Sequence, residues 1–361
     1  MITGFDPEAF VTPMRLRRMD AGSRLALACA HVLIDDVGPG AVNGSATGVA
    51  LGTWSAGLDA LSEYLAALTD HGPTAVPAMM FSNTISNAPA SLCAIEFGLR
   101  GPNVTFNQRE VSAFAAIAYA VDAIRHGRTT AMVAGGADWL DETFFKVYDS
   151  FRVLSPAAGR GGQPATDAEA ARPFDANRNG LVLGEGAFLI LLESARAARE
   201  RGARVHAEIA GIGATSSVTG LNQWPADGSG LVRAMRLAID DASLDADDVG
   251  AVIAAANGSP QLDRVEAEAL RSLFGRRVAA VAALKGALGE SGAAGAAAVV
   301  TAALSTDRLL PPTAGFYHAD PECPVAVSAA PQPLSTGVFI VNGIAGGGAH
   351  YSIVVSTPTV A

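Results

Sequence analysis

A chain of 361 residues can bury one large α/β core or two similar halves. Half of its residues are hydrophobic, and 25 basic against 35 acidic residues give a net charge of −10. This acidic balance argues against a nucleic-acid partner, because phosphate backbones are bound by basic surfaces. The sequence has no basic-then-apolar leader and no uncharged apolar run with the character of a membrane span, so we expect no membrane association.

The three cysteines, Cys29, Cys93 and Cys323, are odd in number and widely spaced. None lies in a CxxC motif or near a histidine at ligand spacing. We therefore expect neither disulfides nor a metal site, and a reducing, cytoplasmic location.

The first hundred residues predict alternating helices and strands. An Ala/Leu-rich helix extends to about Ile34, a short strand covers 49–53, and an amphipathic helix covers 56–69. An unusually apolar loop at 79–85 leads into a helix that contains Cys93. Apolar loops often face a partner or a ligand.

The next segment predicts a strand at 103–107, a helix at 111–126 and a buried strand at 130–136. Residues 155–171 are rich in Gly, Pro and Ala and predict a surface excursion, after which a strand and a helix extend to Arg201. The second half repeats this alternation, with predicted strands at 207–212, 249–255, 278–282, 337–341 and 351–355 and predicted helices at 230–242, 265–273 and 291–304. Such alternation is typical of an α/β fold with a mostly parallel, layered sheet. We expect two βαβ-rich halves, residues 1–203 and 204–361.

The stretch from Gly101 to Phe114 has the layout of a nucleophile elbow, in which a buried strand runs into a sharp turn and a small-residue helix. The apex of such a turn lies at a helix N-terminus, where backbone N–H groups stabilise a thiolate or a developing anion. A Cys or Ser is expected at the apex, but this chain has Glu110 there. A carboxylate cannot do the usual acyl-transfer chemistry.

Several segments together resemble the β-ketoacyl synthase family of the thiolase fold, over nearly the whole chain. They are Gly101–Thr105, Arg172–Asp175, Gly184–Ala187, Val265–Leu270, Lys285–Gly286 with Gly289, and Gly343–His350. The resemblance implies a thiolase-like fold whose two similar halves form a layered α-β-α-β-α core. Family members usually begin with a further strand ahead of the Phe-Asp-Pro region, whereas this sequence starts almost at Phe5. Either that strand is dispensed with or the sequence starts late.

The resemblance also implies a Cys nucleophile and two histidines that assist decarboxylation of a malonyl thioester on an acyl carrier protein. The Cys position falls on Glu110, the first His position on Ala255 and the second on Glu290. Of this set only the lysine, Lys285, is retained. Ala255 cannot transfer a proton, and Glu290 would repel the enolate that the second His stabilises. We therefore expect no catalytic residues in this chain and degenerate positions at Glu110, Ala255, Lys285 and Glu290.

Loss of all three groups on a retained scaffold resembles the chain length factor subunits of type II polyketide synthases, which pair with an active ketosynthase. Those subunits commonly carry Gln at the nucleophile position, and here it is Glu110. The predicted partners are thus an active ketosynthase and a phosphopantetheinylated acyl carrier protein, and no cofactor is expected on the chain itself. Whether the chain is an enzyme in its own right stays open.

By resemblance, two groups of residues meet the partner or the acyl chain. The candidates for the acyl cavity or the interface are Met80, Phe81, Ile85, Phe114 and Ile344, the last at the gatekeeping Phe of the family's Gly-Phe-Gly-Gly loop. The candidate dimer strand is Asn103, Val104, Thr105, Phe106 and Asn107. For Met80, Phe81 and Ile85, ordinary core packing is an equal alternative.

The ionisable candidates have structural alternatives too. Glu110 is either a general base or anhydride-forming nucleophile, or a space-filling polar residue that pairs with Lys285, since an unpaired buried carboxylate is costly. Glu290 is either a catalytic acid or a carboxylate that shares Lys285 or a proton. His350 is expected to be a satisfied core histidine, and Asp175 and Glu185 are expected to be scaffold residues.

Two other functions compete with the silent subunit. The chain could be a malonyl-carrier decarboxylase or acyltransferase that uses Glu110 or Glu290. It could also be a homodimeric scaffold that binds acyl carriers.

Overall fold

The fold was analysed in a computed structural model that describes residues 2–42, 44–74, 76, 78–155, 169–275, 279–305 and 309–358. The chain divides into two compact units that interleave in sequence. Unit 1 comprises 1–147, 184–204 and 291–296, and unit 2 comprises 148–183, 205–290 and 297–361. Part of the predicted excursion at 155–171, residues 156–168, lies outside the described residues.

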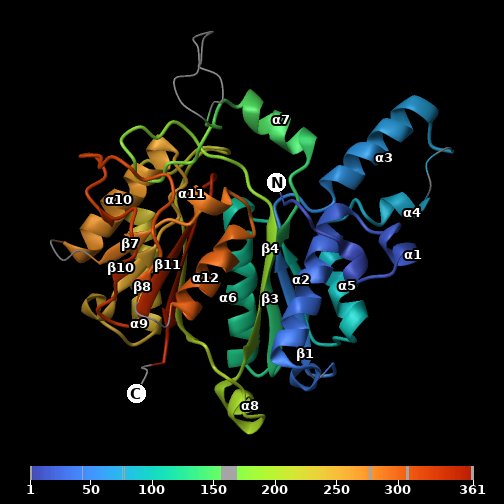
Figure 1. Ribbon diagram of the computed structural model, residues 1–361, viewed down its shortest axis with the longest axis horizontal. Coiled ribbons are helices and arrows are strands. Elements are labelled where there is room, and N and C mark those ends of the chain that lie inside the picture. Colours follow the sequence, from blue (N-terminus) through green and yellow to red (C-terminus); the bar gives the residue numbers. More distant parts are fainter. Residues whose placement is uncertain are drawn as a thin grey trace. The chain divides into compact units, whose positions relative to one another are not determined.

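Unit 1 is built on a four-stranded sheet of order β2-β1-β3-β4 (Figure 1). Its strands are β1 (Thr47–Gly52), β2 (Asn103–Phe106), β3 (Ala131–Asp138) and β4 (Gly186–Glu193). β1 lies parallel to both β2 and β3, and β4 lies antiparallel to β3. All residues of β1 and β3 are buried, which explains why these strands are runs of apolar and small residues without alternation.

Helices cover both faces of this sheet. α6 (Ser112–Arg125) packs on β1 and β3, and α2 (Ala21–Val37) with α5 (Ala88–Phe97) packs on the opposite face (Figure 1). Asp20 starts α2 by accepting a hydrogen bond from Ser23 N. The close approach of α6 requires Gly52, because a Cβ there would lie 2.2 Å from the carbonyl carbon of Ser112. The other helices that lie wholly in unit 1 are α1 (Pro13–Leu16), α3 (Leu58–His71), α4 (Ala78–Phe81) and α8 (Ala195–Glu200).

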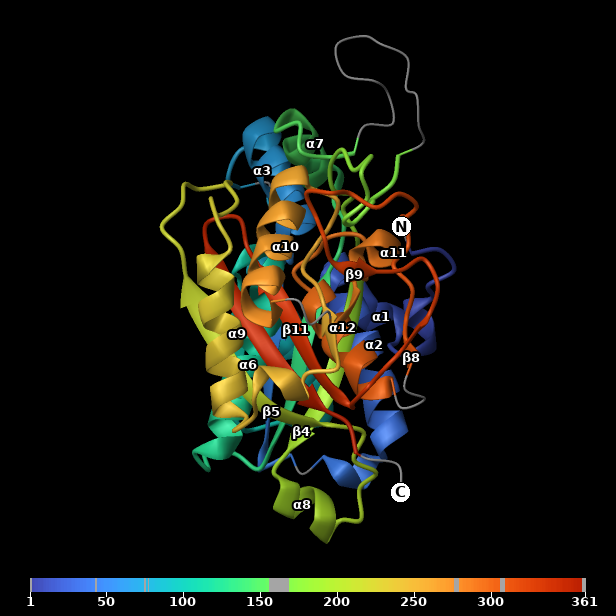
Figure 2. The ribbon, with the colours of Figure 1, turned by 90° about the vertical axis from the view of Figure 1, so that its left-hand side faces the viewer.

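Unit 2 is built on a six-stranded sheet of order β5-β12-β11-β6-β7-β9 (Figure 2). Its strands are β5 (Glu208–Ser216), β6 (Ala251–Ile253), β7 (Ala280–Ala282), β9 (Ala326–Val327), β11 (Val338–Ile344) and β12 (Ala349–Ser356), and a separate pair is formed by β8 (Leu309–Leu310) and β10 (Gln332–Pro333). Its helices are α9 (Ser229–Asp241), α10 (Pro260–Phe274) and α11 (Lys285–Leu288). Two helices, α7 (Glu142–Ser150) and α12 (Ala294–Leu304), have residues in both units.

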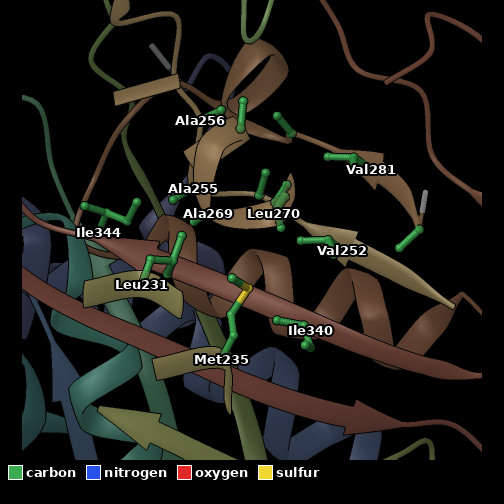
Figure 3. Packing of buried hydrophobic residues seen from close by; sticks show 14 of the residues in the cluster. Leu231, Met235, Val252, Ala255, Ala256, Ala269, Leu270, Val281, Ile340 and Ile344 are labelled. Atoms are coloured by element: carbon green, nitrogen blue, oxygen red, sulfur yellow. The ribbon is translucent and has the colours of Figure 1, made fainter. Parts of the chain in front are cut away.

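The core of unit 2 joins its helices to its sheet. Leu231 and Met235 of α9 and Leu270 of α10 lie in one buried cluster with Val252 of β6 and Ile340 of β11 (Figure 3). The apolar residues of α9 fall on one face, so a single amphipathic helix covers β5, β12 and β11. The predicted alternation of strands and helices is confirmed in both units.

The contact between β5 and α9 predicts a sensitive glycine. A Cβ on Gly213 would lie 1.9 Å from the carbonyl oxygen of Ala234, which is backbone and cannot rotate away. We expect Gly213→Ala to lower the free energy of unfolding by about 2 kcal/mol or more, through overpacking. Chemical denaturation measures this. The matched control is Gly40→Ala, whose Cβ meets nothing within 4 Å and which should leave stability unchanged; equal effects of the two substitutions would contradict the argument.

Candidate degenerate active site

The elbow predicted from the sequence is present in unit 1. β2 ends at Phe106, a 3₁₀ turn covers Arg109–Val111, and α6 starts at Ser112. Arg109 has a left-handed backbone with φ 58°, which is rare for a residue with a Cβ. The Ser112 hydroxyl accepts a hydrogen bond from Gln108 N at 2.9 Å and donates one to Arg109 O at 2.7 Å. These two hydrogen bonds of the Ser112 hydroxyl hold the turn in its sharp geometry.

Glu110 lies at the apex of this turn and is only 2% exposed. Its Oε2 is 3.5 Å from Arg109 Nε. The carboxylate also precedes the first turn of α6, where the helix dipole favours a negative charge. Both effects favour a negative charge on the Glu110 side chain.

Asp138, at the end of β3, holds the backbone segments that surround the elbow. Its Oδ1 accepts hydrogen bonds from Trp54 N at 2.7 Å and Ser55 N at 2.9 Å, and its Oδ2 accepts one from Ala293 N at 3.1 Å. The adjacent Gly292 O accepts a hydrogen bond from Ala113 N of α6. Burial raises the pKa of the Asp138 carboxyl, and the hydrogen bonds from Ser55 and Trp54 oppose that rise. The sequence analysis missed this residue, although a lone Asp after a buried strand was a visible signal.

The other predicted site positions, Ala255, Lys285 and Glu290, lie in unit 2. Lys285 Nζ lies 2.8 Å from Glu290 Oε2, and Asn257 Nδ2 donates a hydrogen bond to the same oxygen at 2.7 Å. The Glu290 side chain is fully buried and that of Lys285 is 10% exposed. The prediction that Glu290 shares Lys285 is thus confirmed. The predicted pair of Glu110 with Lys285 joins residues of different units and stays a prediction.

Ala255 lies in the buried core cluster of unit 2 and is 0% exposed (Figure 3). Its backbone N–H donates to Glu266 Oε1 at 3.0 Å, and Ala256 N donates to Glu266 Oε2 at 2.8 Å. A methyl side chain at this position can neither donate nor accept a proton. Ala255 therefore contributes packing and no acid–base group.

Asp263 of α10 holds the segment that carries Asn257. Its Oδ1 accepts a hydrogen bond from Asn257 N at 3.0 Å, and its Oδ2 accepts one from Phe174 N at 2.8 Å. Burial raises the pKa of Asp263 to about 7, against the opposing effect of these hydrogen bonds and of Arg178. Neither Asp263 nor Glu266 was singled out from the sequence. Their roles depend on contacts with loops, and no local sequence pattern predicts such contacts.

The apolar candidates occupy different environments. In unit 1, Phe81 and Ile85 are 55% and 45% exposed, and Met80 is half-buried. Phe114 is buried, and its ring would meet a Cβ on Gly295 at 2.4 Å. In unit 2, Ile344 is fully buried in the hydrophobic core (Figure 3). Their roles in an acyl cavity or interface stay predictions.

The candidate dimer strand is an edge strand of the sheet in unit 1. Val49 N and Thr53 N of the β1 segment donate to Pro102 O and Phe106 O, so these carbonyls face β1. Because strand residues alternate in direction, the backbone groups of Asn103 and Thr105 face the open edge. The Thr105 hydroxyl is buried without a hydrogen-bond partner among the described residues. Asn107 follows the strand and is exposed.

The three scaffold candidates have defined partners. Asp175 accepts hydrogen bonds from Tyr317 N at 2.7 Å and His318 N at 2.6 Å, and Glu185 accepts one from Leu140 N at 3.1 Å. His350 is fully buried, with Nε2 2.8 Å from the Ser217 hydroxyl. Among the described residues no cluster of side chains could hold a metal ion, and no helix there is long and apolar enough to cross a bilayer.

Comparison with known protein families identifies the family of both halves of the chain. The description "Beta-ketoacyl synthase, N-terminal domain" matches residues 1–198, and "Beta-ketoacyl synthase, C-terminal domain" matches residues 206–317. The chain is 32% identical to the granaticin polyketide putative beta-ketoacyl synthase 1 of Streptomyces violaceoruber, covering 93% of this chain and 82% of that protein. It is also 32% identical to the tetracenomycin polyketide synthase ketoacyl synthase alpha subunit of Streptomyces glaucescens, covering 95% and 83%.

Solved structures agree with this placement. The structure titled "The ishigamide ketosynthase/chain length factor" has a TM-score of 0.88 at 25% identity, covering 98% of this chain and 86% of that one. A beta-ketoacyl synthase from Burkholderia phymatum STM815 has a TM-score of 0.88 at 28% identity, covering 99% and 87%. The predicted thiolase-like α/β fold is confirmed.

The buried pair gives a first prediction for this site. Lys285→Met leaves the Glu290 carboxylate buried without its cation, so we expect the free energy of unfolding to fall by about 3–5 kcal/mol. The double variant Lys285→Met/Glu290→Leu should recover most of this loss, because it removes both charges. Lys146, the other lysine of the chain, pairs with Glu142 in solvent. Lys146→Met should change stability by less than about 0.5 kcal/mol, and a similar loss there would contradict the argument.

His350 gives a second prediction, on pH dependence. Burial lowers the pKa of His350 from 6.5 to about 4, with Arg233 adding to the shift and Asp227 opposing it. As the pH falls from 6.5 to 4, the unfolded chain takes up a proton that the folded chain refuses, so stability is full above pH 6.5 and is lost below it. The loss due to this group is about 3 kcal/mol.

Denaturation of the wild type and of His350→Gln at several pH values measures this difference, since Gln can keep the contact with Ser217 but does not titrate. Parallel pH profiles of the two proteins would show that His350 is not the responsible group.

Proposed function

The chain belongs to the β-ketoacyl synthase family, and we propose that it is a catalytically silent ketosynthase-like subunit of the chain length factor kind. It heterodimerises with an active ketosynthase and shapes the cavity that holds the growing polyketide or fatty-acyl chain. The observation that carries this proposal is the 2.8 Å pair between Lys285 Nζ and Glu290 Oε2. The pair neutralises the one retained member of the family's catalytic set.

The chemistry of the three substituted positions supports silence. Condensation on a carrier-bound thioester needs a nucleophile that forms a stable acyl intermediate and groups that stabilise a developing enolate. Glu110 is a carboxyl side chain beside Arg109, Ala255 is apolar, and Glu290 brings a negative charge where a histidine would oppose one. Each change acts against the same transition state.

The open edge of β2 supports a partner on this side of unit 1. Asn103 and Thr105 present unpaired backbone groups there, and the buried Thr105 hydroxyl has no hydrogen-bond partner among the described residues. A strand from the partner would satisfy these groups by extending the sheet. The similarity to a structure whose title names a ketosynthase and a chain length factor supports the same assignment.

In the proposed complex the substrate is an acyl chain on a phosphopantetheinylated acyl carrier protein, and the partner supplies the Cys and both histidines. Phe81 and Ile85 are large apolar side chains that unit 1 leaves exposed. Their exposure supports a role at the interface or the cavity wall, because a partner or an acyl chain would remove them from water.

Co-expression with an active type II ketosynthase tests the proposal. We expect a stable one-to-one heterodimer that carries out condensation, and we expect Thr105→Pro to lose the heterodimer because proline removes an outward-facing N–H of β2. Circular dichroism and thermal unfolding check that this variant is still folded.

The competing enzyme function is tested on the isolated chain with malonyl-carrier protein. Carbon dioxide release should be absent from the wild type and from Glu110→Ala alike. Release by the wild type that is lost in Glu110→Ala would support a decarboxylase, and a homodimer that condenses substrates alone would overturn the proposal.

A further inference from the structure

Four side chains beside the elbow of unit 1 form a continuous row of contacts. The ring of Phe144, in α7, meets the ring of Trp54 edge-to-face at a centroid distance of 5.1 Å. The Arg109 guanidinium lies over the Trp54 ring, with its Cζ 5.5 Å from the ring centroid. Arg109 Nε is in turn 3.5 Å from Glu110 Oε2. The row therefore connects α7 to the apex of the elbow, and all four residues belong to unit 1.

Trp54 is held by its backbone as well as by its ring. Its N–H donates a hydrogen bond to Asp138 Oδ1 at 2.7 Å, and its carbonyl accepts one from Asn107 Nδ2 at 3.5 Å. A Cβ on Gly292 would lie 3.0 Å from Trp54 N and 2.9 Å from Arg109 O, so a glycine is needed there for the two backbones to come this close. Trp54 is thus a fixed platform for the Arg109 side chain.

Arg109 is the strained member of the row. Its φ of 58° is a left-handed conformation that residues with a Cβ adopt rarely. The electron-rich face of the Trp54 ring and the Glu110 carboxyl group both attract its guanidinium. The residue with the unusual backbone is therefore the one that contacts both the platform and the apex.

The Arg109 side chain occupies the approach to the apex. The side chain of Glu110 is 1% exposed, and that of Arg109 is 21% exposed. A thioester carbonyl must come within about 3–3.5 Å of a nucleophile in order to react. Next to the end of the apex side chain that space holds Arg109, and Arg109 is supported by the indole ring of Trp54.

We propose that Trp54 and Arg109 form a plug that closes the elbow to acyl thioesters. Both are positioning residues, because Trp54 holds Arg109 and Arg109 fills the approach to the apex. The inference goes beyond the proposed function, in which the apex lacks a suitable nucleophile, since it makes the exclusion of an acyl group steric as well as chemical. A thiol placed at the apex stays unreactive while the plug is present.

Alkylation of an engineered apex thiol tests the plug. Glu110→Cys is made in the full chain, and its labelling by iodoacetamide, a small uncharged reagent, is followed by mass spectrometry of the peptide that contains the apex. We expect slow labelling of Glu110→Cys alone. Adding Trp54→Ala or Arg109→Gly should raise the rate by about tenfold or more, because the thiol no longer depends on local opening to be reached. Glycine adopts the left-handed backbone without strain, so Arg109→Gly is expected to stay folded.

The dependence of the labelling rate on pH separates steric closure from charge. Removing Arg109 takes a cation away from the new thiol, which raises the pKa of that thiol and by itself slows labelling at neutral pH. Opening the plug has the opposite effect and raises the limiting rate at high pH, where the thiol is fully ionised. Trp54→Ala keeps the cation and should raise the limiting rate as well.

The matched control is Arg152→Gly. Arg152 is a second arginine with a left-handed backbone, φ 56°, and it belongs to unit 2. Combined with Glu110→Cys, this change should leave the labelling rate unaltered. Continued protection of Cys93 and Cys323, which are buried in the native chain, shows that each variant is folded.

Two results would overturn the proposal. One is labelling of Glu110→Cys alone at the rate of an exposed thiol. The other is a limiting rate that Trp54→Ala and Arg109→Gly leave unchanged, or raise no more than Arg152→Gly does, while Cys93 and Cys323 stay protected. Neither result bears on heterodimer formation with a ketosynthase, so failure here is distinguishable from failure of the proposed function.

Discussion

The arrangement of the predicted site in unit 2 depends on one buried ammonium group, that of Lys285. Lys285 begins the short helix α11, and Gly289, with φ 73°, ends it so that Glu290 returns to the same ammonium. Glu290 N in turn donates to Val182 O, which ties the site to the segment that leads into β4. A buried lysine needs a counter-charge and a buried glutamate needs donors, so each residue makes the other tolerable. The site is therefore held together by this pairing.

In unit 1 the geometry of the elbow is held by the backbone and by Ser112. The left-handed Arg109 costs of order 1 kcal/mol, and such a conformation persists only where the surroundings impose it. Here they include the Ser112 hydroxyl, which bonds the turn on both sides, and Gly292, whose carbonyl accepts from α6. Asp138 fixes that glycine segment by binding Ala293 N. None of these bonds involves the apex side chain, so the apex could change without loss of the turn.

Much of the fold could be predicted from the sequence, because long elements have local signals. The buried run of β1, the small-residue helix α6 and the amphipathic helix α9 each appear at nearly their predicted bounds. Helix α7 was not predicted. It is capped by Asp141, whose Oδ1 accepts hydrogen bonds from Thr143 N and Phe144 N. It is also held by an edge-to-face contact between the rings of Phe144 and Trp54, which are far apart in the chain.

The residues of the candidate site also fall into two groups, those that the sequence could predict and those that it could not. Glu110, Ala255, Lys285 and Glu290 could be singled out from the sequence because motif positions are local and a substitution within a motif is visible in the sequence. Asp138 and Asp263 were not found, because each acts on backbone amides of loops that are distant in sequence, and no spacing rule predicts such contacts. Glu266 lies within a recognised motif, yet its role depends on the amides of Ala255 and Ala256, which only the folded loop presents.

The observed pairing and the proposed silence have one physical origin. A working condensing site must keep ionisable groups poised and incompletely satisfied, which costs stability in the resting protein. In this chain the same positions carry a methyl group, an ion pair and a carboxylate beside Arg109, each of which is compatible with a buried resting state. The proposed role requires no poised group in this chain, because in the proposed complex the partner ketosynthase carries the chemistry.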